Sequence, residues 1–303
     1  MLNSVNSIFA AARGVEKGVV AVAAAHDEDV LRAVVSARRE GIADALLIGD
    51  AARIRGLLHD LNESESYYII EEADGEQSCA QKAVEAVRSG RAGFLMKGLL
   101  NTTELLRAVV NKEAGLSTGR LLSHVMLYEV PAYHKLLYVT DGGMNPAPDL
   151  LKKADILENA AVLLKALGYG QIYASCLCGS ETVSEKIPAT VDASALSQMH
   201  ECWRPYNMAV IGPVGFDLAI SQKSCEHKGY SALGAGDADI LLCPNYETGN
   251  AMGKAFTYFG GARSAGLVVG ARVPIILTSR SDTSETKLAS IALGKAAAHN
   301  MAR

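Results

Sequence analysis

Short apolar runs alternate with amphipathic segments along almost the whole chain of 303 residues. In the first third, strand-like runs at 19–24 and 45–49 precede segments with apolar residues at helical spacing, 27–40 and 50–59. Strands that are separated by helices form parallel sheets with helices on both faces. The alternation therefore predicts an α/β fold with mostly parallel sheets.

The same alternation continues to the C-terminus. Further strands are expected at 67–70, 93–97, 171–176, 208–211, 239–243, 266–269 and 274–278, and further helices at 76–88, 102–110, 149–167, 190–202, 217–227, 247–260 and 282–299. The pattern changes at 123–130 and 135–140, where four residues separate two strand-like runs. A link so short cannot hold a crossover helix, so these strands are expected to be antiparallel or to belong to different domains. Two α/β domains with a boundary near residue 130 are the simplest account.

Composition and charge exclude several classes of protein. Apolar residues make up 49% of the chain, charged residues 20%, and the formal net charge is −4. These values are typical of folded soluble proteins and leave no excess of cations to bind nucleic acid. No apolar run approaches the ~18 residues that would span a membrane, and the apolar run 19–25 lacks a basic region before it. The sequence thus predicts a cytoplasmic protein with neither nucleic acid nor a membrane as partner.

The stretch 278–287 (TSRSDTSETK) follows an expected strand directly and opens the last expected helix. A strand-to-helix turn exposes backbone N–H groups at the positive end of the helix, which favours anions. Thr278 supplies a hydroxyl group, and Arg280 can clamp a phosphate by two parallel hydrogen bonds. The alternative is an ordinary capped helix, with Asp282 as N-cap and Glu285 completing a capping box. The local sequence leaves both interpretations open.

Two other stretches place polar groups after expected strands. In 246–254, Gly249 and Asn250 permit close backbone approach and hydrogen bonding at the carboxyl edge of a sheet, where α/β folds bind ligands. For this stretch taken alone, a loop and a helix start in which the glycines serve only the turn is the favoured interpretation. The turn-rich run 139–149 (VTDGGMNPAPD) lies near the expected domain boundary, a preferred place for ligand sites.

A fourth stretch, 96–107, combines the end of a strand with the start of a helix. Lys97 ends the expected strand, Asn101 can cap the next helix, and Arg107 lies about one turn inside that helix. These three residues are candidates for binding phosphate or a phosphorylated cofactor. A solvated helix arginine is the alternative interpretation of Arg107.

Motifs for other cofactors are missing from the sequence. The seven histidines show no metal-binding spacing, and the acidic residues form no convincing cage for a metal ion. The first strand-to-helix turn reads Ala24-Ala25-His26-Asp27, without the glycine fingerprint of dinucleotide-binding folds. We therefore expect neither a metal nor a nicotinamide cofactor.

Five blocks of the sequence stand in a characteristic order. They are GFLMKGLLNTTELLRAVV at 93–110, LLYVTDGGMNPAPDL at 136–150, IPATVDASALSQM at 187–199, AGDADILLCPNYETGNAMGKAF at 235–256 and ILTSRSDTSETK at 276–287. Together they resemble the phosphate acetyl/butyryl transferase family, most closely its butyryltransferase branch. The resemblance covers nearly the whole chain.

The resemblance implies an architecture and a reaction. It implies two α/β/α domains, 1–130 plus 277–303 and 131–276, with an active-site cleft between them, and a homodimer or higher oligomer. It implies that acyl-CoA, inorganic phosphate and acyl phosphate are the substrates, with coenzyme A consumed or released rather than resident. A short acyl group, butyryl or similar, would pass directly between CoA and phosphate in a ternary complex.

The resemblance also implies roles for single residues. Ser279 and Arg280 match an active-site serine and arginine, and Arg107 matches an arginine that is placed toward phosphate. Thr286 departs from the acetyltransferase branch, where an aspartate is proposed to deprotonate the CoA thiol. Glu285 is its neighbour, and Asp282 lies one turn earlier.

Two other functions stay open on the sequence alone. The first is a metal- and nicotinamide-dependent decarboxylating dehydrogenase on a related fold, which would need acidic metal ligands. The second is a non-catalytic acyl-CoA-binding relative, which the threonine at position 286 makes conceivable.

Overall fold

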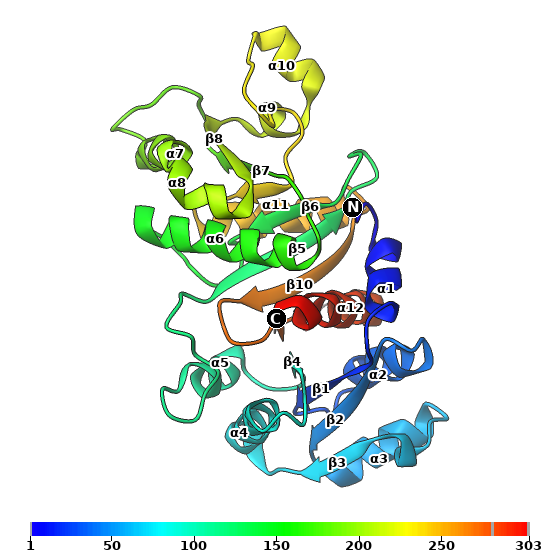
Figure 1. Ribbon diagram of the computed structural model, residues 1–303. Coiled ribbons are helices and arrows are strands. Elements are labelled where there is room, and N and C mark those ends of the chain that lie inside the picture. Colours follow the sequence, from blue (N-terminus) through cyan, green and yellow to red (C-terminus); the bar gives the residue numbers. More distant parts are fainter. Residues whose placement is uncertain (1, 280–281, 302–303) are drawn as a thin grey trace. The chain divides into compact units, whose positions relative to one another are not determined.

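The chain divides into two compact units in the computed structural model, which describes residues 2–279 and 282–301. Unit 1 consists of Met1–Val5 and Leu121–Ser264, and unit 2 of Asn6–Arg120 and Ala265–Arg303. Helices and strands alternate in both, so the predicted mixed α/β fold with mostly parallel strands is confirmed (Figure 1). The domain division expected from the sequence, 1–130 plus 277–303 and 131–276, stays a prediction.

Unit 2 is built on six strands in the order β3-β2-β1-β4-β11-β10. The strands are β1 (Gly18–Ala23), β2 (Ala43–Gly49), β3 (Ile69–Glu72), β4 (Phe94–Lys97), β10 (Arg263–Val269, with residues from 265 on in this unit) and β11 (Ile275–Ile276). The pairs among β1, β2, β3, β4 and β11 are parallel, and β10 runs antiparallel to β11. Five strands therefore end at the same edge of the sheet.

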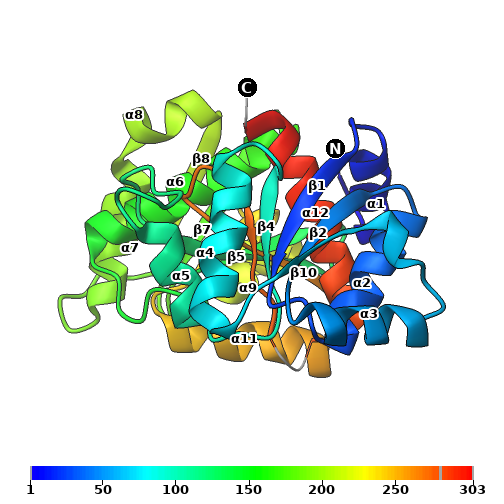
Figure 2. The same ribbon diagram turned by 90° about the horizontal axis from the view of Figure 1, so that it is seen from below.

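The helices of unit 2 cover both faces of this sheet. Besides α1 (Val5–Arg13, with residues from 6 on in this unit), they are α2 (Glu28–Arg39), α3 (Ala51–Asp60), the 3₁₀ helix η1 (Glu65–Tyr67), α4 (Gly75–Arg88), α5 (Thr102–Val110) and α12 (Ser284–Met301). Figure 2 shows α4 and α5 on one side of β1 and β4, with α2, α3 and α12 on the other. Asp27 caps α2, because its carboxylate accepts the Val30 N–H at 3.0 Å.

Unit 1 is built on five strands in the order β5-β6-β9-β7-β8. They are β5 (Ser123–Glu129), β6 (Leu137–Thr140), β7 (Ile172–Leu177), β8 (Met208–Val214) and β9 (Ile240–Leu242). The expected antiparallel pairing of the first two is confirmed, and the other pairs are parallel. The helices are α6 (Leu150–Ala166), α7 (Pro188–Gln198), α8 (His200–Trp203), the 3₁₀ helix η2 (Arg204–Tyr206), α9 (Phe216–Ile220), α10 (Gln222–Lys228) and α11 (Tyr246–Tyr258).

Two expectations about local structure are wrong, and one helix was missed. The single helix expected at 217–227 is broken into α9 and α10 at Ser221, whose backbone is extended and whose hydroxyl caps α10 by accepting the Ser224 N–H at 3.2 Å. The strand expected at 274–278 is shortened to the two residues of β11. Helix α1 (Val5–Arg13) was not expected at all.

None of the helices in the described part of the chain is long and apolar enough to cross a membrane. The longest, α12, is instead buried along most of its length, from Lys287 to Ala297. This burial includes two lysines, which is unusual because a buried ammonium group loses its hydration.

Lys295 is the clearer of these two cases. It is 3% exposed, and its ammonium group has no hydrogen-bond partner among residues 2–279 and 282–301. Its side chain lies against the start of β1, where a Cβ placed on Gly18 would be 3.3 Å from its Cε atom. Burial lowers the pKa of Lys295, and the carboxylate of Glu16 opposes this shift. The buried ammonium therefore destabilises the folded state at neutral pH.

We predict that Lys295→Met raises the free energy of unfolding at pH 7 by about 1–3 kcal/mol, the usual scale for an unsatisfied buried polar group. Because the pKa of this lysine is lowered in the folded state, the wild type gains stability as pH rises toward the unfolded value of about 10.4. The difference in the free energy of unfolding between the variant and the wild type should be smaller at pH 10 than at pH 7. Denaturant unfolding at both pH values measures it, with exposed Lys112→Met as the control. An equal or lower stability of Lys295→Met at pH 7 would contradict this account.

Candidate functional site

The carboxyl ends of the parallel strands collect the polar residues of each unit. In open parallel sheets this edge is where ligands bind, because the turns there open helices whose free N–H groups point outward. In unit 2 the edge carries the turns after β1, β4 and β11, and in unit 1 the turns after β6 and β9. The stretches singled out in the sequence all include one of these turns or follow it directly.

Gly98 joins the turns after β1 and β4 in unit 2. The Gly98 N–H donates to the Ala23 carbonyl at 2.8 Å, and the Leu99 N–H donates to the Ala24 carbonyl at 2.8 Å. A Cβ on Gly98 would lie 2.2 Å from the Ala24 carbonyl oxygen, so no larger residue fits without moving the backbone. The glycine thus fixes the start of the stretch that holds Lys97 and Asn101.

Lys97 and Asn101 both lie at this edge, in different surroundings. Lys97 is the last residue of β4 and is 7% exposed, and its ammonium group donates to the Gly98 carbonyl at 3.2 Å. Asn101 holds the N-cap position of α5, but its side chain makes no capping bond. Instead, its backbone and side-chain N–H groups both donate to the Glu76 carboxylate at 2.9 Å. The expected cap is therefore wrong, and Asn101 ties α5 to α4.

The turn after β11 is closed by its own hydrogen bonds. The Asp282 carboxylate accepts the Ser279 N–H at 2.7 Å, and the Asp282 N–H donates to the Ser279 carbonyl at 3.1 Å. Thr278 is buried, whereas Ser279 and Glu285 are exposed. Arg280, the strongest candidate in the sequence, lies outside the described residues.

The cap of α12 differs from the one expected in the sequence. The helix begins at Ser284, and the Thr283 hydroxyl accepts the Thr286 N–H at 3.2 Å. Thr283 rather than Asp282 is therefore the capping side chain, since the Asp282 carboxylate is engaged with Ser279. Lys287 in the first turn was missed by the sequence analysis. Its ammonium group donates to the Asp282 carbonyl.

Arg107 lies in the second half of α5, away from the carboxyl edge. It is five residues beyond Thr102, which corresponds to roughly 8 Å along the helix axis. Its guanidinium group pairs with the Glu104 carboxylate at 2.6 Å and 2.7 Å, and its side chain is 65% exposed. It borders a cavity of about 330 Å³ between α4 and α5. A role in phosphate binding would require the guanidinium to exchange Glu104 for a ligand, and that role stays a prediction.

Asp141 organises the turn after β6 in unit 1. One of its carboxylate oxygens accepts the N–H groups of Gly143 at 2.7 Å and Met144 at 2.8 Å. The other accepts the Asn145 side-chain amide at 2.6 Å and the His124 N–H at 3.2 Å. Four donors thus converge on one buried carboxylate, which compensates its charge and fixes the turn.

This turn packs directly on the first turns of α11. A Cβ on Gly249 would lie 2.8 Å from the Gly142 Cα atom, so the two backbones touch. The Asn250 side-chain amide donates to the Gly142 carbonyl at 3.2 Å. The close approach and hydrogen bonding expected of Gly249 and Asn250 are therefore present, although they join protein to protein.

Asn245 caps α11 and was missed in the sequence. Its side-chain oxygen accepts the Thr248 N–H at 3.0 Å and the Thr248 hydroxyl at 2.7 Å. The Tyr246 N–H donates to the Pro146 carbonyl at 3.1 Å. Asparagine directly after a strand and before a glycine-containing helix is a signal that could have identified this cap.

The thiols near these turns are poor nucleophiles. Cys243 follows β9, and burial raises the pKa of its thiol to about 12, with a smaller contribution from Asp141. Burial also raises the pKa of the Cys178 thiol to about 11. Both are protonated near neutral pH and lack the thiolate that covalent catalysis needs. In the described residues, no group of three or more His, Cys, Asp or Glu side chains could hold a metal ion.

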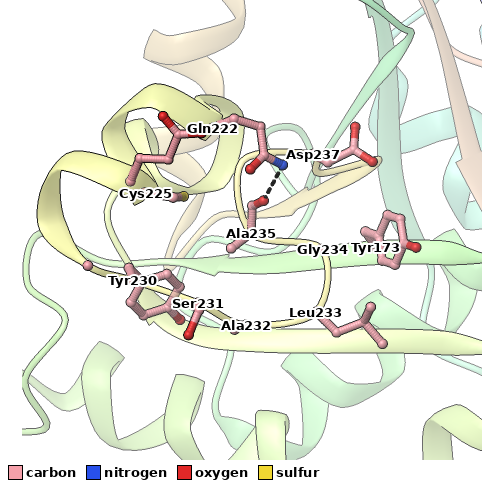
Figure 3. Close-up of a pocket in the computed structure, with 12 residues that line it drawn as sticks. Tyr173, Gln222, Cys225, Tyr230, Ser231, Ala232, Leu233, Gly234, Ala235 and Asp237 are labelled. Carbon is pink, nitrogen blue, oxygen red and sulfur yellow. Dashed lines mark hydrogen bonds between the residues drawn. The ribbon is translucent and has the colours of Figure 1, made fainter.

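A cavity of about 760 Å³ lies at the opposite, amino-terminal edge of the unit 1 sheet (Figure 3). Its lining includes Tyr173 near the start of β7, Glu226 in α10 and Asp237 before β9. Asp237 is paired with Lys135 at 3.1 Å and with His134 at 2.7 Å. Two carboxylates in its wall make the cavity unfavourable for a phosphate or for CoA, which are anions.

Comparisons with known proteins identify the family of the chain. The family model described as phosphate acetyl/butaryl transferase matches residues 70–295. A phosphate butyryltransferase of Clostridium acetobutylicum is 40% identical over 300 residues, covering 99% of this chain and 100% of that protein. A phosphate acetyltransferase of Rhizobium meliloti is 39% identical over 286 residues, covering 94% and 90%. A crystal structure of a branched-chain phosphotransacylase from Enterococcus faecalis has a TM-score of 0.82 at 32% identity, covering 93% and 99%.

These matches define the class of the protein as acyltransferase. The chain belongs to the phosphate acetyl/butyryl transferase family, since the family model and the relatives cover most of its length. The resemblance seen in the five sequence blocks is thereby confirmed.

We predict that Gly249→Ala lowers both stability and activity, because the added methyl group would meet the Gly142 backbone and no flexible side chain can yield. The expected loss is about 1–3 kcal/mol in the free energy of unfolding, as for other overpacked contacts. Gly56→Ala in α3 is the matched control, since its methyl group would meet nothing within 4 Å. That control should gain up to about 1 kcal/mol. Equal stability of the two variants, measured by denaturant unfolding, would refute the contact.

Proposed function

We propose that the protein is a phosphate acyltransferase that moves a short acyl group reversibly between CoA and inorganic phosphate. The observation that carries this proposal is the 40% identity to a phosphate butyryltransferase over 99% of the chain. Similarity over the full length includes every turn at the carboxyl edges of both units. The preferred acyl group is butyryl or a similarly short chain, since that relative is named for butyryl transfer.

The reaction needs no covalent enzyme intermediate. The CoA thiolate attacks the carbonyl carbon of the acyl phosphate, and a C–S bond forms. The C–O bond to the phosphate then breaks, and phosphate leaves with the bonding electrons. The high pKa values of Cys178 and Cys243 favour direct transfer in a ternary complex, because neither thiol can replace the CoA thiolate as nucleophile.

Roles follow for the residues at the unit 2 edge. Arg280 and Ser279 would bind the phosphoryl or carbonyl oxygens on which charge develops, and fixed donors are most effective there. Thr278 and the buried ammonium group of Lys97 would add donors for phosphate. Asp282 already accepts a hydrogen bond from Ser279, so we assign it to fixing this turn rather than to proton transfer.

The other proposed residues bind rather than react. Asn101 and Arg107 would contact phosphate groups of the substrates, each after exchanging its present carboxylate partner. Gly249 and Asn250 would shape the unit 1 edge, where the N-terminus of α11 favours an anion. Glu285 is the nearest candidate base to the position of Thr286.

The setting of the protein is part of the same proposal. We infer a cytoplasmic enzyme of short-chain fatty acid metabolism that forms a homodimer or a higher homo-oligomer. Coenzyme A acts as a substrate, and the proposed reaction requires neither a metal nor a nicotinamide cofactor.

We predict phosphate-dependent release of CoA from acyl-CoA, with a higher kcat/KM for butyryl-CoA than for acetyl-CoA. Since each methylene group in an apolar pocket contributes about 1–3 kcal/mol, the preference should be no more than ~10–200-fold per methylene. The assay compares acetyl-, propionyl-, butyryl- and branched acyl-CoA, each with and without phosphate. A higher kcat/KM for acetyl-CoA would overturn the chain-length preference and leave the reaction class intact.

Two findings would overturn the reaction itself, the first from this assay with a measurement of CoA binding beside it and the second from a separate dehydrogenase assay. CoA binding without any phosphate-dependent transfer would favour a non-catalytic acyl-CoA-binding protein. Magnesium-dependent reduction of a nicotinamide cofactor would favour a decarboxylating dehydrogenase.

A further inference from the structure

Lys287 holds a buried positive charge at the start of α12. The residue is 4% exposed and lies in the first turn of the helix. Its ammonium group donates to the Asp282 carbonyl, a backbone group of the turn that precedes the helix. Within the described residues, which omit 280–281, no carboxylate lies within ion-pairing distance of this ammonium group.

The ammonium group of Lys287 has three N–H donors, and the described part of the chain supplies one acceptor for them, the Asp282 carbonyl. The N-terminus of a helix carries a partial positive charge, which repels a cation. Burial adds the cost of removing the ammonium group from water, and one neutral carbonyl offsets only part of that cost. A bound anion would compensate both the repulsion by the helix N-terminus and the lost hydration, since the ammonium group and the start of the helix both attract it.

The turn that Lys287 holds is the one at which the proposed reaction takes place. Asp282 links Lys287 to Ser279, because the Asp282 carbonyl accepts from the lysine and its carboxylate accepts the Ser279 N–H at 2.7 Å. The preceding strand, β11, is parallel to β4, which ends at the second buried lysine of this edge, Lys97.

Among the described groups around Lys287, the exposed Glu285 carboxylate is the remaining candidate for removing a proton from CoA. The Thr286 hydroxyl is not a base near neutral pH, and it accepts a hydrogen bond from the Thr283 hydroxyl at 3.3 Å. The Asp282 carboxylate is engaged with Ser279. The proposed reaction nevertheless consumes a thiolate, and a free thiol with a pKa of about 8.5 is mostly protonated at pH 7. A nearby cation is the alternative to a base, because it stabilises the thiolate directly.

We propose that Lys287 stabilises the CoA thiolate with its ammonium group, so that the reaction proceeds without a general base at position 286. This inference rests on the proposed function and identifies how that function is achieved. The thiol proton passes to solvent, and the thiolate then attacks the acyl phosphate. In the reverse direction the same ammonium group stabilises the departing thiolate.

The test is the pH dependence of kcat/KM for CoA, measured from pH 6 to 9.5 with butyryl phosphate as the acyl donor. For the wild type, kcat/KM for CoA should reach its rise at a pH below 8.5. The ammonium group stabilises the thiolate, so the bound CoA thiol ionises at a lower pH than a free thiol. Lys287→Met should lose about tenfold or more at pH 7 and recover most of the loss at pH 9.5, where the free thiol ionises unaided. Lys287→Arg keeps the charge and should keep the profile of the wild type.

Lys295→Met is the matched control, because Lys295 is the other buried lysine of α12 and lies about two turns further along the helix. Its pH profile should equal that of the wild type. Thermal unfolding of each variant identifies general damage, and Lys287→Gln replaces Lys287→Met if the latter does not fold.

Two outcomes would overturn the inference while leaving the proposed function intact. One is a loss of kcat/KM in Lys287→Met that is equal at every pH, which indicates a structural role. The other is an unchanged pH profile with a raised KM for phosphate in the reverse reaction, which places the ammonium group on phosphate instead. A wild type that shows no phosphate-dependent transfer at all would instead refute the proposed function, and this inference with it.

Discussion

The parallel pairing of strands is the constraint on which the site depends. Because β1, β4 and β11 run in one direction, their last residues and the turns that follow reach the same edge of unit 2. The pairs of β9 with β6 and β7 do the same in unit 1. Glycines then let these turns approach one another, as the contacts of Gly98 with Ala24 and of Gly249 with Gly142 show. A side chain at either glycine would separate turns that carry the candidate site residues.

Charge at these edges is compensated in two ways. The Asp141 carboxylate collects four hydrogen bonds from its own turn and from β5, so its burial is satisfied within the protein. Lys287, in contrast, has a carbonyl as its described partner. A fully satisfied group fixes structure, whereas a group that is satisfied in part is ready to interact with a ligand. For Asp141 and Lys287, this difference separates a group that shapes the site from one that is proposed to act in it.

The sequence predicted the fold well because the spacing of apolar residues shows which side of each helix or strand is buried. These buried sides determine how helices and strands pack in layers. Close backbone approach at Gly249 was one of two interpretations of its stretch, and the structure places this glycine against Gly142 of the same chain. The sequence prediction failed where one residue interrupts a pattern, as Ser221 does between α9 and α10. It also failed where two side chains compete for one role. Asp282 looked like a cap, but it binds the Ser279 N–H and leaves the cap to Thr283. Local composition cannot decide such competition, because it depends on the path of the turn.

Hydrogen–deuterium exchange with CoA and phosphate, measured by mass spectrometry, tests most directly whether the carboxyl edges bind the substrates. The account predicts slower exchange in peptides that cover 97–101, 141–148, 245–254 and 278–287 when both ligands are present. Peptides that cover 222–237, around the acidic cavity at the amino edge of unit 1, should exchange at the same rate with and without ligands. Protection that is confined to 222–237, with none at the four carboxyl-edge stretches, would contradict the account.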